Sequence, residues 1–376
     1  MKNVSESDPP MDPELSRMMD AGIADRVFPG GALLVRVQGK TRHASYHGRT
    51  ALDPAGVPVS RNTCFDLASL TKILATTPLV LLAVQHGNLD LDRRACELLP
   101  SFVGDGRDAI ALRMLLDHSS GLPAWRRYFE HVPPAELSTA AGLETVRKMV
   151  TAEVPEAPPG SRALYSDLGF VLLQWILERV YGRPSDTLFM DWLARPLGLE
   201  RLFFVDLKSP AASARARTGR VFAATEDCPW RGRLLRDEVH DENTYAMGGV
   251  GGQAGLFGTA EDVAAMGQAW LDSLLTDHGL FRRDLVQQFW QKSRLPGSTR
   301  TLGFDTPSSG ASQAGNGFGP RTVGHLGFTG TSLWIDPDRE LIAVLLTNRV
   351  HPTRDNESIK QFRPVLHTAV AARWPK

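Results

Sequence analysis

The stretch Ser69-Leu70-Thr71-Lys72 places a hydroxyl and an amine three residues apart, directly before an apolar run at residues 73–84. Positions i and i+3 share one face of a helix, so the two side chains meet if a helix begins here. A lysine that burial keeps neutral can accept the proton of the serine hydroxyl and so activate it as a nucleophile. The stretch predicts a serine–lysine pair for acyl transfer. Taken alone, it suits an ordinary helix start without any chemistry better than it suits a nucleophile.

The apolar run after this tetrapeptide predicts a buried helix. It ends at His86-Gly87-Asn88, where Gly87 can adopt the left-handed conformation that closes a helix, and Pro78 predicts a kink within it. The run is shorter than the roughly 20 apolar residues that cross a bilayer, so we expect a core helix. Ser69 would lie at its amino end, where free backbone N–H groups favour an oxyanion.

The composition limits the possible functions. Lysine plus arginine equals aspartate plus glutamate at 42 each, so the balance of charge indicates neither nucleic acid nor a membrane as a partner. A chain of 376 residues, 42% of them hydrophobic, can form a large core, which we expect in two lobes. Three scattered cysteines do not suggest a disulfide framework or a zinc site. Residues 1–20 lack the pattern of a secretory signal, which predicts a cytoplasmic protein.

The expected secondary structure falls into three zones. Residues 13–22 predict an amphipathic helix, and residues 31–37 with 42–48 predict a hairpin. From residue 89 to residue 246, helices alternate with loops rich in proline and glycine, which predicts a helical lobe.

The third zone predicts further sheet and two helices. Thr259-Ala260-Glu261-Asp262 resembles a capping box that opens a helix ending at Leu275. Apolar strands follow at residues 331–335 and 341–346, with a turn at residues 336–338 between them. Residues 361–372 predict a final helix packed on that sheet.

Two more motifs are compatible with chemistry at Ser69. Tyr165-Ser166-Asp167 stands at a junction between a loop and the apolar helix 170–180, from which a phenol can reach a cleft. Gly324-His325-Leu326-Gly327 leads into the penultimate strand, and its glycines allow close approach to the backbone. Each has a structural alternative: Tyr165 as a core phenol, Asp167 as a helix N-cap and His325 as a structural histidine.

Ser69-x-x-Lys72, Tyr165-Ser166-Asp167 and His325-Leu326-Gly327, in this order and spacing, resemble the motifs of the penicillin-recognising serine hydrolases. Within that superfamily the chain is similar to the class C β-lactamase-like group, which includes D-aminopeptidases, DD-carboxypeptidases and family VIII carboxylesterases. The resemblance runs from about Arg26 to the C-terminus and includes the phrase at residues 247–257.

The resemblance implies an α+β fold of the β-lactamase/transpeptidase type, with a five-stranded antiparallel sheet flanked by helices and an inserted helical lobe. Residues 1–62 and 250–376 would form the sheet lobe and residues 63–249 the mainly helical lobe, with the active site between them. It also implies roles for individual residues: Ser69 as nucleophile, Lys72 as its proton partner, Tyr165 as the base that passes a proton to the leaving group, and the backbone N–H groups of Ser69 and Phe328 as the oxyanion hole.

Two departures from the family pattern alter the expected substrate. Asp167 stands where asparagine is frequent, and beside Lys72 its charge would keep the amine protonated and move the role of base toward Tyr165. His325 stands where the third motif usually has lysine, and a neutral imidazole binds a carboxylate less strongly than an ammonium does. We therefore predict weak β-lactamase activity and a preference for neutral esters or amides, with Asp167, His325, Gly327 and His240 contacting the substrate.

Several other features attract attention. Residues 249–254 match a loose dinucleotide fingerprint, but no strand leads into them, so a tight turn is the better interpretation. Residues 239–243 look like a metal cluster, yet no second histidine stands at helical spacing, so we predict no metal and a polar loop in which His240 faces the cleft. His118, between Asp117 and Ser119, suggests a triad, but a helix end is expected there.

The leading hypothesis is a serine hydrolase that forms an acyl-enzyme on Ser69, needs no cofactor and cleaves a small ester, amide or peptide. Its alternative within the enzyme class is a D-aminopeptidase or DD-carboxypeptidase acting on cell-wall peptides, with Arg126, Arg127 or His325 holding the carboxylate. A sensor that stays acylated, or a scaffold without turnover, is the hypothesis from another class. The sequence does not fix the oligomeric state.

Overall fold

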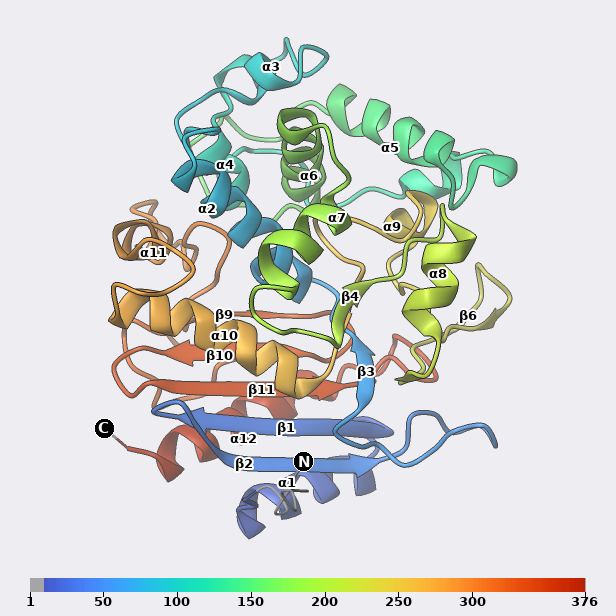
Figure 1. The fold of residues 1–376 in the computed structure, drawn as a ribbon, viewed down its shortest axis with the longest axis vertical. Coiled ribbons are helices and arrows are strands. Elements are labelled where there is room, and N and C mark those ends of the chain that lie inside the picture. The colour runs from blue at the N-terminus through green and yellow to red at the C-terminus, as the bar shows by residue number, and fades with distance from the viewer. Residues whose placement is uncertain (1–9, 376) are drawn as a thin grey trace, which may run out of the picture.

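The computed structural model describes residues 10–375. The expected absence of a leader depends partly on residues 1–9, which lie outside the described residues. Its centre is a five-stranded antiparallel sheet in the order β2-β1-β11-β10-β9 (Figure 1). The strands are β1 (Gly30–Val37), β2 (Lys40–Gly48), β9 (Val323–Leu326), β10 (Ser332–Asp336) and β11 (Leu341–Thr347). Both ends of the chain therefore build one sheet, which confirms the predicted α+β fold.

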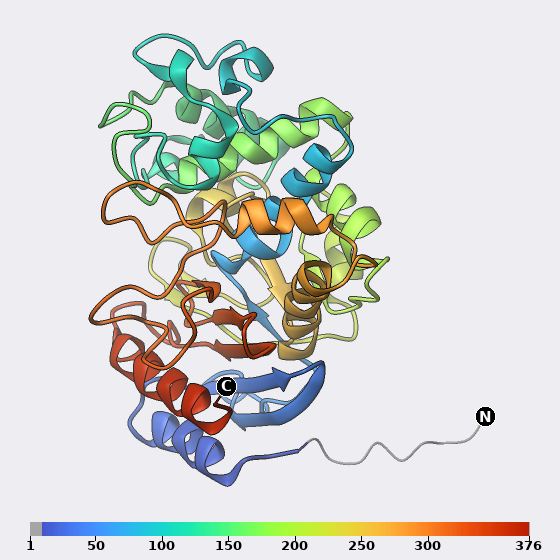
Figure 2. The ribbon, with the colours of Figure 1, turned by 90° about the vertical axis from the view of Figure 1, so that its left-hand side faces the viewer.

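Strands β1 and β11, inside the sheet, are covered on both faces. Successive side chains of a strand point to opposite sides, so each strand contributes to two cores. In β1, Leu33 and Val35 pack with helices α1 (Pro13–Ala24) and α12 (Ile359–Arg373), whereas Leu34 belongs to the main core on the other face. That other face is covered by α10 (Ala260–Leu275). Figure 2 shows α1 and α12 side by side on one side of the sheet and α10 on the other.

The predicted elements of the sheet lobe are confirmed with small shifts of their ends. The hairpin turn at Gln38 and Gly39 has positive φ at both residues, 52° and 72°, as a two-residue turn between twisted strands requires. Thr259 caps α10 by accepting a hydrogen bond from the N–H of Asp262. The predicted final helix is α12, which begins two residues earlier than expected.

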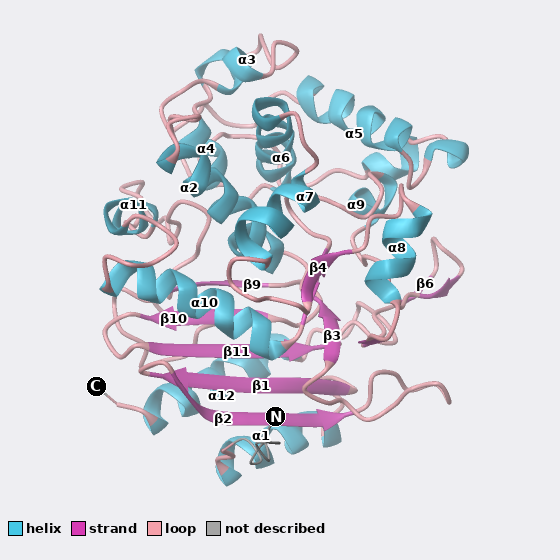
Figure 3. Ribbon diagram, viewed as in Figure 1, coloured by secondary structure: helices cyan, strands magenta, loops and turns pink. Residues whose placement is uncertain are grey.

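A group of helices lies beyond the β9 edge of the five-stranded sheet (Figure 3). They are α2 (Thr77–Gln85), α3 (Ala95–Leu98), α4 (Leu112–Leu116), α5 (Ala140–Ala152), α6 (Asp167–Tyr181), α7 (Ser185–Phe189), α8 (Pro210–Arg217), α9 (Glu242–Ala246) and α11 (Arg283–Phe289). Short strands form a second sheet in the order β4-β8-β3-β5, from β3 (Thr63–Asp66), β4 (Leu202–Phe204), β5 (Val221–Phe222) and β8 (Leu256–Gly258), and a pair β6 (Asp227–Cys228) with β7 (Arg233–Leu234). In this second sheet, β8 of the predicted sheet lobe pairs with β3 and β4 of the predicted helical lobe. The predicted boundary at residue 249 stays a prediction.

The segment that carries Ser69 connects β3 to α2. Ala68 has a positive φ of 46°, which is uncommon for a residue with a side chain, and its N–H donates to Asp66 Oδ1 at 2.8 Å. A π-helical turn at Lys72–Thr76 follows, and α2 begins at Thr77. Pro78 has no N–H to donate and occupies the first turn of α2, where that N–H would have no partner. The predicted interruption of the helix at Pro78 is therefore replaced by a helix that starts at Thr77, and the π turn before it was not predicted.

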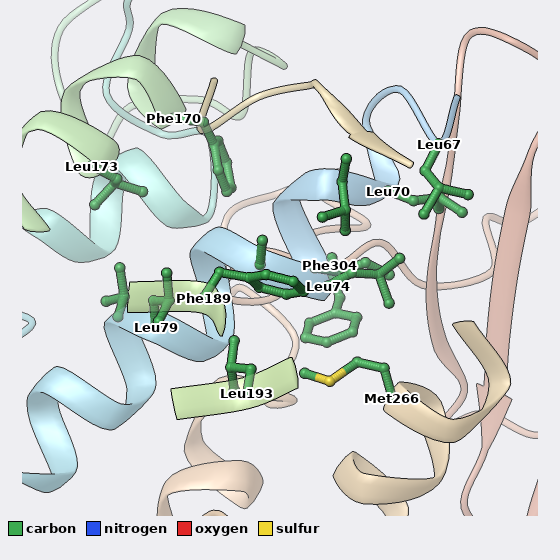
Figure 4. Packing of buried hydrophobic residues seen from close by; sticks show 14 of the residues in the cluster. Leu67, Leu70, Leu74, Leu79, Phe170, Leu173, Phe189, Leu193, Met266 and Phe304 are labelled. Atoms are coloured by element: carbon green, nitrogen blue, oxygen red, sulfur yellow. The ribbon is translucent and has the colours of Figure 1, made fainter. Parts of the chain in front are cut away.

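Apolar side chains from several elements hold this segment in place. Leu70 and Leu74 are fully buried and belong to one cluster with Phe170 of α6 and Met266 of α10. Figure 4 shows these residues converging on the segment. Fixing the helix from several sides fixes the direction of Ser69 and Lys72. Within residues 10–375, no helix is both long and apolar enough to span a membrane; the cytoplasmic location stays a prediction.

Candidate active site

Ser69, Lys72 and Tyr165 meet around the Ser69 hydroxyl. Lys72 Nζ donates to Ser69 Oγ at 3.0 Å, and the Tyr165 hydroxyl donates to the same oxygen at 2.9 Å. Tyr165 comes from the loop before α6, 96 residues further along the chain. A serine within hydrogen-bond reach of two groups that can carry its proton has the geometry of an activated nucleophile.

Lys72 is completely buried and forms a close ion pair with Asp167. Its Nζ lies 2.7 Å from Asp167 Oδ1 and also donates to the Gln253 carbonyl at 3.0 Å. Burial by itself would lower the pKa of Lys72, but the charge of Asp167 and the contact with Tyr165 outweigh it and raise that pKa above its ordinary value. The resting lysine is therefore an ammonium, as the sequence led us to expect for an aspartate at this position.

Asp167 is the first residue of α6, and Ser166 takes the N-cap position. Among the described residues, neither side chain makes an N-capping hydrogen bond to this helix. The N-cap interpretation of Asp167 is therefore wrong, because its carboxylate turns to Lys72 instead.

Tyr165 is enclosed by two histidine rings and by the cations Lys72 and Arg300. The ring of His118 lies 4.5 Å from its ring centroid and that of His325 lies 5.8 Å away. The Arg300 guanidinium lies 5.0 Å from the same centroid. Burial raises the pKa of the Tyr165 phenol, so it is protonated at rest and can donate to Ser69.

His118 is a residue that the sequence did not single out for this site. It follows α4 with a positive φ of 61°, which confirms the predicted helix end. Its Nδ1 accepts the N–H of Ser166 at 3.0 Å, so it fixes the residue between Tyr165 and Asp167. No motif could have indicated this contact, because it joins a turn to a loop 48 residues away.

The predicted oxyanion donors remain available. Among residues 10–375, no acceptor takes a hydrogen bond from the backbone N–H of Ser69 or of Phe328. The turn that carries Phe328 is held against the Ser69 segment, because Thr331 Oγ1 donates to the Leu67 carbonyl at 3.1 Å. Two free N–H groups beside a nucleophile can bind the oxygen of a tetrahedral intermediate.

His325 lies in strand β9, and Gly327 directly follows that strand at the start of the turn. His325 is 3% exposed, its Nδ1 contacts the Leu326 carbonyl at 2.8 Å, and its Nε2 has no partner among the described residues. Burial, together with the cations Lys72 and Arg300, holds the pKa of His325 well below its usual range, so the imidazole is neutral. Gly327 approaches the backbone of Leu67 so closely that an added Cβ would lie 2.6 Å from its carbonyl oxygen.

His240 lies beside Phe328 rather than pointing freely into the cleft. Its ring stacks on the Phe328 ring with 5.6 Å between centroids, and its Nε2 lies 3.1 Å from Glu226 Oε2. Its backbone N–H donates to Asp66 Oδ2 at 2.7 Å. These contacts describe a buried support for Phe328, and a direct contact with substrate stays a prediction.

Most of these residues border one cavity of about 590 Å³, namely Ser69, Tyr165, Asp167, His240, His325, Gly327 and Phe328. Lys72 and His118 are not part of its lining. Trp125, Arg300, Arg349 and Arg363 also line it. Arg300 was missed because the segment around it matches no motif, yet it puts a cation beside Tyr165 where His325 supplies none. The structure does not bring Arg126 and Arg127 to the cavity lining, since they pair with Glu156 and Glu130 on the exposed surface. Within the described residues, no cluster of metal-ligating side chains occurs.

Comparison with known proteins identifies the family of the chain. The family model described as Beta-lactamase matches residues 15–365. A protein of Escherichia coli (strain K12) named "Putative D-alanyl-D-alanine carboxypeptidase" is 32% identical over 312 residues, which cover 78% of this chain and 71% of that protein. The chain therefore belongs to the β-lactamase family, and it is a hydrolase.

Solved structures show the same fold at lower identity. EstCE1, described as a hydrolase with promiscuous acyltransferase activity, has a TM-score of 0.72 at 22% identity, covering 95% of this chain and 97% of that one. A class C β-lactamase has a TM-score of 0.70 at 19% identity, covering 95% and 96%.

Proposed function

We propose that this protein is a serine hydrolase that forms an acyl-enzyme on Ser69 and cleaves small esters or amides. The observation that carries the proposal is the pair of hydrogen bonds to Ser69 Oγ, from Lys72 at 3.0 Å and Tyr165 at 2.9 Å, at the wall of a cavity of about 590 Å³. A cavity of this volume accommodates a small organic substrate.

In the proposed reaction, Ser69 Oγ attacks the substrate carbonyl after a proton transfer that makes Lys72 neutral. Lys72 first passes its extra proton to Asp167, and the neutral amine then accepts the proton of Ser69. The carbonyl oxygen becomes an oxyanion and is bound by the N–H groups of Ser69 and Phe328. Tyr165 gives its proton to the leaving group and regains one from Lys72, whose Nζ lies 5.1 Å from the centroid of the Tyr165 ring. Water then attacks the acyl group by the same route and releases Ser69.

The proposal is tested by intact mass and product release with a short-chain p-nitrophenyl ester. We expect an acyl adduct and steady turnover in the wild type, and neither in Ser69→Ala. Ser309→Ala, at an exposed loop position, is the matched control and should behave as the wild type. Equal activity in all three proteins would contradict the proposal, and a stable adduct without turnover would support the acylated sensor instead.

A second candidate substrate is a peptide that ends in a carboxylate, as a DD-carboxypeptidase requires. Arg300 favours it, because its guanidinium faces the cavity and has only a loose contact of 3.5 Å with Asp305. A substrate carboxylate could replace that contact with a bidentate one. The name of the Escherichia coli relative points the same way.

This second candidate is tested with an N-acylated D-Ala-D-Ala peptide and with the same peptide as its C-terminal amide. We expect Arg300→Ala to raise KM for the free carboxylate about tenfold or more, because a charge-assisted hydrogen bond contributes about 1.5–3 kcal/mol. KM for the amide form should not change. Equal effects on both peptides would contradict a role for Arg300 in carboxylate binding.

A further inference from the structure

Arg363, on the side of α12 that faces the sheet, contacts the peptide group behind the predicted oxyanion hole. It is 5% exposed, and its Nη2 donates to the Gly327 carbonyl and to the Thr331 carbonyl, each at 2.8 Å. The Gly327 carbonyl and the Phe328 N–H belong to one planar trans peptide group, in which they point in opposite directions. The guanidinium therefore lies at one end of the peptide dipole and the oxyanion site at the other.

The charge of Arg363 is not balanced by any acid. Among residues 10–375, no carboxylate lies within ion-pair distance of its guanidinium, and its Nε is buried without a partner. Burial and the nearby charge of Arg349 lower the pKa of Arg363 to about 9, which still leaves it cationic at neutral pH. A buried charge without a counter-ion destabilises a folded protein by several kcal/mol at the order-of-magnitude level.

A purely structural contact does not require that charge. Two backbone carbonyls can be satisfied by a neutral donor such as glutamine without the desolvation cost of a guanidinium. The cation has a use only if negative charge develops nearby during the reaction. The tetrahedral intermediate places such a charge at the Phe328 N–H, on the far side of the same peptide group.

We infer that Arg363 is a positioning residue of the oxyanion hole, which fixes the Gly327–Phe328 peptide and polarises it so that the Phe328 N–H becomes a stronger donor. This inference rests on the proposed acyl transfer at Ser69. Hydrogen bonds that share one peptide group strengthen each other, because a donor at the oxygen increases the positive charge on the hydrogen. Arg349 supports the same residue from another side, since its Nε donates to the Phe328 carbonyl at 2.8 Å.

The test compares Arg363→Met, Arg363→Gln and Arg363→Lys with the wild type. We measure kcat and KM with a p-nitrophenyl ester, together with the infrared carbonyl stretch of a slowly deacylating acyl-enzyme. We expect the methionine and glutamine variants to lose about tenfold to hundredfold in kcat, less than the roughly 10² to 10³ of a lost donor, with KM within about twofold. Their carbonyl stretch should move to higher frequency, and the lysine variant should recover part of both effects.

Arg107→Met is the matched control for loss of a buried arginine. Arg107 is 9% exposed and its guanidinium also donates to two backbone carbonyls, those of Gly104 and Thr151, but it does not line the cavity. We expect this control to keep the wild-type kcat and carbonyl stretch in its folded fraction. Should Arg363→Met fail to fold, Arg363→Gln gives the same comparison with a neutral donor kept in place.

The outcomes separate the inference from the proposed function. A wild-type protein that forms no adduct on Ser69 refutes the proposed function before any variant is compared. If the wild type forms the adduct but the neutral Arg363 variants keep the wild-type kcat and carbonyl stretch, the inference alone is overturned. A lysine variant as slow as the methionine variant also overturns it, since charge would then not matter.

Discussion

At the scale of single residues, Asp167 decides how the proton moves. Its carboxylate, 2.7 Å from Lys72, keeps the lysine charged, whereas a base must be neutral. The pair therefore has to exchange a proton before Ser69 can react. An asparagine at this position would leave the burial of Lys72 unopposed.

We predict that Asp167→Asn moves the rising limb of the kcat/KM–pH profile to lower pH. Burial lowers the pKa of Lys72, and the charge of Asp167 is the largest effect that raises it, so removing the carboxylate lowers that pKa and the neutral amine forms at lower pH. A nearby opposite charge shifts a pKa by about 1 to 3 units, so we expect a shift of at least about one pH unit. Asp305→Asn, which removes a carboxylate from the cavity wall without touching Lys72, is the control. A slower enzyme with an unmoved limb would show that Tyr165 alone acts as base.

His325 determines the expected behaviour toward penicillins. Because its pKa lies well below the usual range, the imidazole stays neutral between about pH 5.5 and about pH 8. We therefore predict slow penicillin hydrolysis at both ends of this interval, and faster hydrolysis in His325→Lys. Efficient turnover by the wild type at about pH 8 would refute the prediction. Arg300 adds a cation that the sequence motifs did not reveal, so the test also shows whether it substitutes for the missing lysine.

At the scale of elements, the turn between β9 and β10 must fit tightly against the Ser69 segment. We predict that Gly327→Ala lowers kcat at least about tenfold and destabilises the protein by about 1–3 kcal/mol, as overpacking typically does. The added Cβ would lie 2.0 Å from Thr331 Oγ1 and 2.6 Å from the Leu67 carbonyl, so the Phe328 N–H must move away from Ser69. Activity and urea denaturation check both effects.

Gly310→Ala is the control for this substitution. Its φ of +88° makes alanine strained there, but nothing lies within 4 Å of the added Cβ. We expect a modest loss of stability without loss of activity. If both variants lost activity equally, close packing at Gly327 would not be the cause.

The elements were predictable where local patterns decide them. Capping at Thr259 and the continuous runs of buried residues in the strands lead directly to α10, β10 and β11. The π turn was not predictable, because only tertiary packing around Leu70 and Leu74 decides how the chain accommodates Pro78. In the same way, the motifs indicated Ser69, Lys72 and Tyr165. Arg300 and Arg363 reach the site from segments whose sequences carry no signal, so only the folded structure brings them there.

At the scale of the whole molecule, buried histidines make stability depend on pH. Burial lowers the pKa of His43 and of His367 to about 4, and both are completely buried. Between about pH 6.5 and about pH 4, the unfolded chain takes up protons at these positions and the folded chain does not. Stability therefore falls as the pH decreases through this interval, by about 1.4 kcal/mol per pH unit for each histidine.

We predict that the free energy of unfolding in urea decreases steadily from pH 7 to pH 5, with a smaller slope in His43→Gln. The exposed His278 gives the control, since His278→Gln should leave the slope unchanged. A free energy of unfolding that stays constant over this range would contradict the prediction. Buried His118 and His325, whose pKa values are also well below the usual range, add to the slope of the wild type.

The pairing of β1 with β11 has a consequence for synthesis of the chain. Gly31 of β1 pairs with Thr347 of β11. Strands β11, β10 and β9, which complete the sheet beside β1, are translated last. Contacts between residues so far apart in sequence form slowly and late. During translation, the β1 edge of the β1–β2 hairpin stays unpaired until β11 is made. The turn at Phe328 and helix α12 are translated only after Ser69, Lys72 and Tyr165. In the proposed mechanism, the nucleophile is therefore made early and the oxyanion donor at Phe328 late, so we expect no acyl transfer by a nascent chain that ends before Phe328.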